Sequence, residues 1–374
     1  MLERSVASHI KTDLNEKMVL LMGPRQVGKT TLARAIYPDS TEYLNYDRLD
    51  DLKIITGTAW KRDCDLLVLD EIHKMKKWKS WIKGVYDTEG IKPGIIVTGS
   101  ARLDTYKKGG DSLAGRHYYY RLDPFSVAEL KKHMSPDEAL ESLLKFGGFP
   151  EPLLKGSETA AKRWRNTNIE RIIRDDLQDL EKIHDLRSIA TLVHLLRERV
   201  GLAVSYQSLA EDLQVAPNTV KKWIGVLEAL LVVFVVRPYS KNIAKAILKE
   251  PKIYFYDTGS VIGDEAARLE NTMAVSLLKR LHFITDTTGD ETGIFYVRDK
   301  LKRESDFLTV RDGRPEYLVE VKLSDGNPAK QLEYFGRFLK PKGIFQIVKN
   351  LQRDVDSGGI KIRKASRWLA SLEA

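Results

Sequence analysis

Short apolar runs mark three predicted strands in the first 125 residues of the chain. They are Met18–Met22, the run that ends in two acids at Asp65–Glu71, and Gly94–Ser100. Apolar runs of this length that stop at turn or charged residues are typical of buried strands. The segment after the first run, LARAIY, has the apolar spacing of a helix instead. Strands that alternate with helices predict an α/β fold with a parallel sheet.

The pattern changes further along the chain. From about residue 126 to 200, apolar residues recur at helical spacing, as in IERIIRDDLQDLEKI and IATLVHLLRERV. Strand patterns return in KIYFYDTG, GIFYVRD, Ser305–Val310 and Tyr317–Lys322, and the segment ARLENTMAVSLLKRL between them predicts an amphipathic helix. The turn residues Arg311–Arg314 predict a hairpin between the last two strands.

The loop after the first strand carries phosphate-binding chemistry. Its sequence fits G-x-x-x-x-G-K-T in the strand–loop–helix setting that this motif requires. The glycines allow backbone N–H groups to wrap phosphates, and the helix N-terminus adds its positive dipole end. Lys29 is predicted to reach the β- and γ-phosphates of ATP, and the Thr30 hydroxyl to bind Mg²⁺. The predicted nucleotide-binding residues are Gly23, Pro24, Arg25, Gln26, Val27, Gly28, Lys29, Thr30 and Thr31.

The second and third predicted strands end in polar residues at the same edge of the sheet. Asp70 is predicted to hold the Mg²⁺ shell, and Glu71 to orient or deprotonate the attacking water. Nucleotides bind at the carboxyl ends of parallel strands in such sheets. Ser100 or Thr98 is therefore a candidate to bond the γ-phosphate or the lytic water, with a plain turn after the strand as the alternative.

Four segments, GPRQVGKTTLA, LLVLDEIHK, IIVTGSARLD and SLAGRHYYYRLDPFSVAEL, resemble the AAA+-type predicted ATPases of bacteria and archaea that carry a DUF4143 C-terminal region. The resemblance implies an arginine near the γ-phosphate at Arg116, with Arg102 as a second candidate, acting in cis or as a finger for a neighbouring subunit. It also implies a homo-oligomer, a ring such as a hexamer or a partial ring. The segment Gly147–Pro152 matches a further family signature, for which a helix-packing turn is the expected role.

A winged helix-turn-helix is predicted after the helical middle region. Ser205–Leu213 forms the first helix, Pro217 starts the second, and VVFVVRPYS provides a wing strand. The second helix of such a motif normally enters the major groove of DNA. The predicted DNA-binding residues at its N-terminal end are Asn218, Thr219, Lys221 and Lys222, although such domains also serve as protein-interaction modules.

The C-terminal strands carry a nuclease-like pattern. Asp306 heads one strand, and Glu320 and Lys322 lie on one face of the next strand because side chains alternate. This is the arrangement of PD-(D/E)xK nucleases, in which two carboxylates hold Mg²⁺ and a lysine lies near the scissile phosphate. Glu270 is the candidate acid on the preceding helix. A charged solvent face and a nuclease fold without activity both remain open.

These features predict an α/β chain with four parts. Residues 1–125 form an AAA+-like P-loop ATPase core, 126–195 a helical lid and 196–245 a winged helix-turn-helix. Residues 246–374 form a DUF4143-like, restriction-endonuclease-like α/β domain.

Composition adds little to this organisation. Of 374 residues, 61 are Lys or Arg and 52 are Asp or Glu, a formal charge of +9 that favours an acidic partner such as DNA. The single cysteine, Cys64, excludes intrachain disulfides and cysteine-cluster metal sites. The charged N-terminus lacks the apolar run of a signal peptide, and the longest apolar stretch is too short to span a bilayer. We therefore expect a cytoplasmic protein without membrane contact.

The sequence supports three functions. The preferred one is an ATPase, with ATP and Mg²⁺ as cofactors, that remodels or moves on duplex or branched DNA. The second is a signalling or toxin-controlling NTPase switch that binds a protein partner, and the third is an ATP-licensed, Mg²⁺-dependent nuclease.

Overall fold

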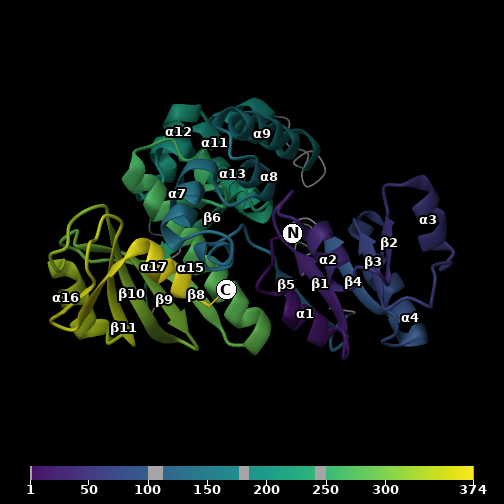
Figure 1. The fold of residues 1–374 in the computed structure, drawn as a ribbon. Helices are drawn as coiled ribbons and strands as arrows, with labels where there is room; N and C mark the ends of the chain where they lie inside the picture. Colours follow the sequence, from purple (N-terminus) through teal and green to yellow (C-terminus); the bar gives the residue numbers. More distant parts are fainter. Residues whose placement is uncertain (1, 100–112, 177–184, 241–249, 374) are drawn as a thin grey trace. The chain divides into compact units, whose positions relative to one another are not determined.

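The computed structural model describes residues 2–99, 113–176, 185–240 and 250–373. These residues form two compact units, Met1–Asp123 and Pro124–Ala374. The second unit spans the residues for which the sequence predicts a helical lid, a winged helix-turn-helix and a nuclease-like domain. Each unit is built around one β-sheet (Figure 1).

The N-terminal unit contains a five-stranded parallel sheet of order β2-β3-β4-β1-β5. The three apolar runs of the sequence form its buried central strands β1, β3 and β4, as predicted, because strands with both faces covered need apolar residues throughout. The strands are β1 (Met18–Met22), β2 (Thr41–Asn45), β3 (Leu66–Asp70), β4 (Gly94–Gly99) and β5 (His117–Arg121).

Helices cover both faces of this sheet (Figure 1). On one face, side chains of α3 and α4, such as Ile55 and Ile82, join Leu20 and Leu69 in a buried apolar cluster. On the other face, α1 packs on β1, and α2 packs on β3 and β4. The helices are α1 (Ala7–Asp13), α2 (Lys29–Ile36), α3 (Leu49–Thr56) and α4 (Trp78–Glu89), with a 3₁₀ turn at Ile72–Lys74.

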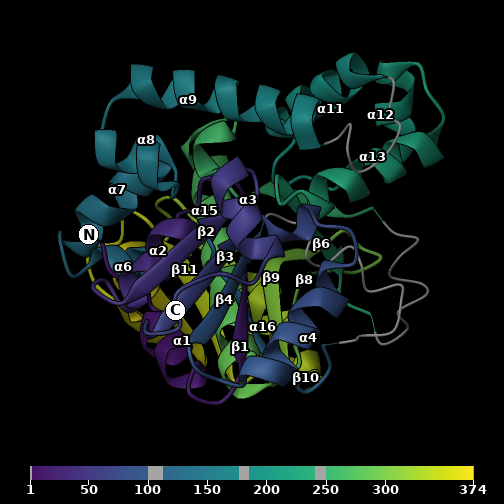
Figure 2. The ribbon, with the colours of Figure 1, turned by 90° about the vertical axis from the view of Figure 1, so that its right-hand side faces the viewer.

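The C-terminal unit begins with helices. Figure 2 shows α9 running from the α7–α8 pair towards the group formed by α11, α12 and α13. A capping box at Ser135 and Glu138 starts α7. The helices are α6 (Val127–Leu130), α7 (Pro136–Phe146), α8 (Pro150–Lys155), α9 (Glu158–Arg171), a π-helical turn (Ile172–Asp176), α11 (Leu186–Glu198), α12 (Tyr206–Leu213) and α13 (Pro217–Ala229).

The remainder of this unit is an eight-stranded mixed sheet of order β12-β13-β11-β10-β9-β8-β6-β7. The predicted hairpin joins β9 and β10, and its turn residues Asp312 and Gly313 both have positive φ. The elements are β6 (Val233–Pro238), β7 (Lys252–Phe255), a 3₁₀ turn (Thr258–Ser260), α15 (Glu265–Thr288), β8 (Thr292–Arg298), β9 (Glu304–Arg311), β10 (Arg314–Lys322), α16 (Lys330–Leu339), β11 (Gly343–Val348), β12 (Val355–Ser357), β13 (Ile360–Lys364) and α17 (Ala365–Ser371).

The strand predicted as a wing has two neighbours. β6 pairs antiparallel with β7, and its last residues Arg237 and Pro238 pair parallel with β8. The hairpin that follows α13 is therefore also the edge of the eight-stranded sheet. This shared strand is the physical reason why the predicted winged helix and nuclease-like parts pack as one unit.

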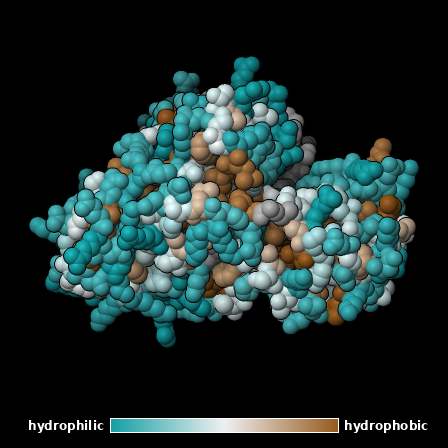
Figure 3. Space-filling view, in the orientation of Figure 1, coloured by the Kyte–Doolittle hydropathy of each residue, from teal (hydrophilic) through white to brown (hydrophobic). Residues whose placement is uncertain are grey.

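The face shown in Figure 3 is mostly hydrophilic, with apolar side chains in scattered groups. Among the described residues, the most exposed large apolar side chains are Leu49, Leu301 and Phe338, which are 75%, 73% and 70% exposed. None of the helices in the described residues combines the length and the apolar composition that a membrane span requires.

Candidate nucleotide-binding site

The G-x-x-x-x-G-K-T loop lies at the carboxyl end of β1, and α2 begins at Lys29. A side chain at position 23 would meet the carbonyl oxygen of Leu122 at 2.3 Å, so only glycine fits there. Gly28 has φ of 100°, a backbone conformation that glycine adopts without strain. The loop therefore has the compact shape that lets N–H groups converge on a phosphate.

Lys29 is buried, and its ammonium lies over the loop. Nζ donates hydrogen bonds to the carbonyl oxygens of Gly23 and Pro24, both at 2.9 Å. Of the other predicted loop residues, Val27 is buried, Arg25 is half-buried, and Gln26 and Thr31 are exposed. Arg4, which the sequence analysis did not single out, donates to the carbonyl oxygen of Val27 at 3.5 Å.

Asp70 ends β3 beside the start of α2 and is buried. Its Oδ2 accepts hydrogen bonds from the hydroxyls of Thr30 and Tyr43, both at 2.8 Å. Its Oδ1 accepts from the Thr98 hydroxyl at 2.5 Å. A hydroxyl and a carboxylate that meet beside the phosphate loop are the ligands expected for the Mg²⁺ of a nucleotide, so these residues fit that ion.

Two neighbours, Thr98 and Tyr43, donate hydrogen bonds to Asp70. Thr98 is buried, and its hydroxyl bonds Asp70 rather than facing the phosphate loop. Tyr43, on the adjacent strand β2, was not predicted as a site residue, because a tyrosine in a short strand carries no motif signal. Burial raises the pKa of Tyr43 to about 12, so its hydroxyl keeps its proton.

Glu71 follows Asp70 in a left-handed conformation, with φ of 57°. A non-glycine residue in this region is uncommon and is found disproportionately at functional sites. Burial raises the pKa of the Glu71 carboxyl above its ordinary value, although Lys74 at 3.5 Å opposes that rise. A carboxylate with a raised pKa is a better proton acceptor at neutral pH, as a general base requires.

Arg116 lies at the opposite edge of the sheet. Its carbonyl oxygen accepts a hydrogen bond from the N–H of Met18, the first residue of β1, whereas the phosphate loop follows the last residue, Met22. The guanidinium holds Asp87 of α4 through Nε at 2.7 Å and Nη2 at 3.1 Å. Ser100 and Arg102, the other candidates of this region, lie outside the described residues.

The predicted DNA-binding residues lie in the first turns of α13. Asn218, Lys221 and Lys222 are exposed, and Thr219 is half-buried. Val220 and Trp223 on the opposite face are buried and hold α13 in the unit. Before α12, Ala203 forms an isolated bridge with Lys252 of β7.

The nuclease-like residues come together in the C-terminal unit. Lys322 Nζ lies 2.8 Å from Glu320 Oε1, and Asp306 Oδ2 accepts from the backbone N–H of Val321 on the same strand as Glu320. Within the described part of the chain, Glu320 Oε2 is buried without a hydrogen-bond partner. Burial and the nearby Asp306 raise the pKa of Glu320 to about 7.

Glu270, the predicted helix acid, is engaged by a second lysine. Lys252, only 2% exposed, places Nζ 3.3 Å from Glu270, 2.8 Å from Glu304 and 3.6 Å from Asp306. Glu270 also accepts from the Tyr254 hydroxyl at 2.6 Å, and burial raises its pKa to about 7. Among the residues with described positions, no three His, Cys, Asp or Glu side chains are grouped to hold a metal ion. Sequence reasoning missed Lys252 because it belongs to no motif.

The Gly147–Pro152 signature has a packing role. A side chain at Gly147 would meet Asp257 Oδ1 at 2.0 Å, and one at Gly148 would meet the Phe125 carbonyl oxygen at 2.7 Å. Asp257, from the YDTG segment after β7, forms a buried ion pair with Arg165 of α9 at 2.7 Å. The Gly147–Pro152 signature therefore packs against a buried ion pair.

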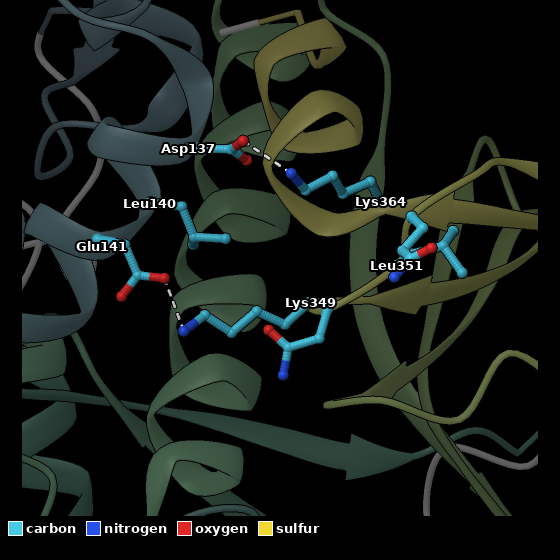
Figure 4. A pocket seen from close by; sticks show the side chains of 8 residues that line it. Asp137, Leu140, Glu141, Lys349, Leu351 and Lys364 are labelled. Carbon is cyan, nitrogen blue, oxygen red and sulfur yellow. Dashed lines mark hydrogen bonds and ion pairs between the residues drawn. The ribbon is translucent and has the colours of Figure 1, made fainter.

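A polar pocket of about 470 Å³ lies in the C-terminal unit between α7 and the turn after β11 (Figure 4). Its charged side chains face one another: Lys349 lies 2.6 Å from Glu141, and Lys364 lies 2.7 Å from Asp137. Lys349 also contacts Glu265. Because these charges are balanced within the protein, we assign no ligand to this pocket.

Comparison with known proteins agrees with the N-terminal site. Residues 15–131 match a family model described as an AAA domain. Residues 137–263 match a model described as a domain of unknown function, DUF8612. The DUF4143 resemblance remains an expectation from the sequence.

Similar proteins occur in a bacterium and an archaeon. The uncharacterized protein Rv2008c of Mycobacterium tuberculosis is 27% identical over 338 residues, which cover 85% of this chain and 73% of that protein. The uncharacterized protein MJ1637 of Methanocaldococcus jannaschii is 26% identical over 405 residues, with 92% and 83% covered. These relatives share most of their length with the chain.

One solved structure with some similarity is a DNA polymerase III gamma subunit-related protein from Thermotoga maritima. It is 11% identical, with a TM-score of 0.28, over 60% of this chain and 97% of that one. Such a TM-score is too low to establish a common fold, so the family model and the loop geometry carry the assignment. The N-terminal unit is therefore similar to an AAA domain, and this similarity supports an ATPase of the AAA type.

Proposed function

We propose that this chain hydrolyses ATP at the Gly23–Thr31 loop and couples the hydrolysis to remodelling or movement on duplex or branched DNA. The observation that carries the proposal is the meeting of Thr30 with Asp70 beside Lys29 and Glu71. These four side chains supply the cation, the metal ligands and the base that phosphoryl transfer requires.

The chain's own residues have separate tasks in this reaction. On nucleotide binding, Lys29 exchanges the carbonyl oxygens of Gly23 and Pro24 for phosphate oxygens. Thr30 and Asp70 would hold Mg²⁺, which would neutralise charge on the phosphates. Glu71 accepts a hydrogen bond from the attacking water, orients it and takes its proton. The water oxygen bonds to the γ-phosphorus as the bond from that phosphorus to the β–γ bridging oxygen breaks, and ADP leaves.

The DNA part of the proposal is supported by the order of elements around α13. Helices α11, α12 and α13 are followed by the β6–β7 hairpin, and Ala203 bridges to that hairpin. This is the order of a winged helix-turn-helix, whose second helix reads DNA. The exposed Lys221 and Lys222 give its first turns positive charge, which favours contact with phosphates.

The position of Arg116 supports the formation of a homo-oligomer. Four residue steps of β1 separate Met18 from Met22, roughly 13 Å along the strand, so Arg116 and the phosphate loop lie at opposite ends. Arg116 is therefore placed to serve a neighbouring subunit rather than its own nucleotide. We propose a homo-oligomer, a ring or partial ring, in which Arg116 completes the adjacent site.

Steady-state ATP hydrolysis tests this function. It is measured without DNA and with single-stranded, duplex and four-way-junction DNA, each at low and at higher salt. We expect stimulation by duplex or junction DNA that fades with salt, and its loss in the double variant Lys221→Ala, Lys222→Ala. The variant Lys29→Ala should fold normally and lose hydrolysis. Unchanged hydrolysis in Lys29→Ala refutes the ATP site, and hydrolysis indifferent to every DNA refutes the DNA coupling.

A nuclease is a second candidate, favoured by Glu320, whose Oε1 contacts Lys322 and whose buried Oε2 has no hydrogen-bond partner among the described residues. Two carboxylates and a lysine are the minimum set for Mg²⁺-dependent cleavage. Against a nuclease, the Lys252 ammonium already contacts Glu270, Glu304 and Asp306, where a metal ion would compete with it. Mg²⁺-dependent DNA cleavage that disappears in Asp306→Asn and in Lys322→Ala would establish this activity.

A further inference from the structure

Tyr43 connects the second strand of the ATPase sheet to the predicted metal ligand. β2 and β3 run parallel with Tyr43 opposite Val68 and Asn45 opposite Asp70. From this position the Tyr43 ring reaches along the sheet, and its hydroxyl lies 2.8 Å from Asp70 Oδ2. The same oxygen accepts the Thr30 hydroxyl at 2.8 Å. Tyr43 therefore contacts Asp70 at the atom that faces the phosphate loop.

The neighbours of Tyr43 set the direction of its hydroxyl hydrogen. Asn45 Nδ2 donates to the Tyr43 hydroxyl oxygen at 3.2 Å, so the hydroxyl accepts from Asn45 and directs its own hydrogen to Asp70. The guanidinium of Arg34, on the helix that follows the phosphate loop, lies 5.2 Å from the ring centroid. The ring is thus held from β2 and from α2 together.

The hydrogen bond from Tyr43 to Asp70 has a role that the hydrogen bond from Thr98 does not fill. Thr98 holds Oδ1, so a bond to Oδ2 is needed to stop rotation of the carboxylate about that contact. Thr30 supplies such a bond in this structure, but Thr30 is also the residue predicted to bind Mg²⁺. Tyr43 is not a metal ligand, so its bond to Oδ2 persists when Thr30 turns to the ion.

We propose that Tyr43 is a positioning residue for the nucleotide-bound Mg²⁺, acting by holding the Asp70 carboxylate towards Thr30. This inference rests on the proposed ATP site. Hydrogen-bond partners of metal ligands orient those ligands, and their loss typically weakens metal binding by roughly tenfold or more. Tyr43 should therefore affect the binding of Mg²⁺ with the nucleotide, and not the binding of the nucleotide alone.

The test is equilibrium binding of a fluorescent, non-hydrolysable ATP analogue to the full chain, in EDTA and in saturating Mg²⁺. Tyr43→Phe removes the hydroxyl and keeps the ring that Arg34 contacts. We expect the same Kd as wild type in EDTA and a Kd about tenfold weaker in Mg²⁺. Asn45→Ala removes the hydrogen bond that orients the Tyr43 hydroxyl. This variant should also weaken the Kd measured in Mg²⁺, but by a smaller factor.

Tyr118→Phe is the matched control. It removes a hydroxyl that bonds the Glu16 carboxylate at 2.9 Å, and that hydroxyl belongs to β5 rather than to the strands beside Asp70. It should leave both Kd values unchanged. If Tyr43→Phe equals wild type in Mg²⁺, or loses affinity equally in EDTA, the positioning role is overturned. If wild type does not bind the analogue in either condition, the ATP site itself fails.

Discussion

The hydroxyl of Thr30 lies 2.8 Å from Oδ2 of Asp70, although the two residues are 40 positions apart in the sequence. This contact joins the helix after the phosphate loop to the carboxyl end of β3. It places the two predicted Mg²⁺ ligands together through contacts of the folded chain itself. The site is therefore largely preorganised, and single substitutions around it should have separable effects on binding and on turnover.

Substitution of Glu71 should lower the turnover of ATP while leaving the binding of ATP nearly unchanged. In Glu71→Gln we expect turnover to fall by about 10²–10⁴-fold, while the Kd for ATP with Mg²⁺ stays within a factor of about two. Steady-state hydrolysis and equilibrium nucleotide binding check this. Glu42→Gln, on β2, is a control that should keep full turnover, and normal turnover in Glu71→Gln would remove Glu71 as the base.

The pH dependence of turnover follows from the same carboxyl. A general base works only when deprotonated, and burial raises the pKa of Glu71 above its ordinary value. Turnover should therefore fall, as pH decreases, at a higher pH than an unperturbed glutamate would give. A pH–rate profile measured at saturating ATP checks this. An acidic limb at the ordinary glutamate value would contradict the assignment.

Arg116 should act on the nucleotide of a neighbouring subunit. Arg116→Ala is expected to lose on the order of a thousandfold in turnover and to keep ATP binding. Because Lys29→Ala retains Arg116 and Arg116→Ala retains the phosphate loop, mixing the two inactive variants should restore part of the turnover. Asp87→Ala removes the ion-pair partner of Arg116 and is the control that should stay active. No recovery on mixing would contradict a trans role.

The buried pair of Arg165 and Asp257 should stabilise the C-terminal unit. Asp257→Asn leaves a buried guanidinium without its counter-charge, which typically costs about 3–5 kcal/mol. Because the C-terminal unit is less stable, peptides from α9 and β7 should exchange hydrogen faster, while nucleotide binding by the N-terminal unit stays unchanged. Glu158→Gln, which removes the exposed pair with Lys145, should leave the exchange unchanged. Equal effects of the two variants would refute this role of the buried pair.

The buried carboxylates beside Lys252 and Lys322 predict how the stability of the C-terminal unit depends on pH. The pKa of Glu270, which lies near Lys252, Tyr254 and Asp306, is raised to about 7. The folded unit therefore holds a proton that the unfolded chain has already lost between about pH 4.5 and pH 7. Stability should fall as pH rises through this window.

Glu320, which faces Asp306, Lys322 and Gln331, has a similarly raised pKa. It should therefore also lower the stability of the unit as pH rises through this window. Hydrogen exchange of β9 and β10 at several pH values measures the effect. Glu270→Gln and Glu320→Gln should each flatten the dependence, whereas Glu333→Gln, on the exposed face of α16, should not. Stability that rises with pH across the window would contradict the raised values.

The sequence alone determined the part of the fold that depends on local pattern. Unbroken apolar runs are required where a strand is covered on both faces, so β1, β3 and β4 could be predicted from the sequence. The phosphate loop could be predicted because its glycines are needed for a particular backbone shape. The hairpin between β9 and β10 could be predicted because its turn residues accept positive φ.

Only the tertiary structure decided which distant side chains meet. The bond from Tyr43 to Asp70 depends on the register of two parallel strands, and the position of Lys252 among three carboxylates depends on the packing of β7 against α15 and β9. The placement of Arg116 away from its own phosphate loop depends on the direction of β5. These contacts join residues far apart along the chain, and a local pattern carries no information about such a distance.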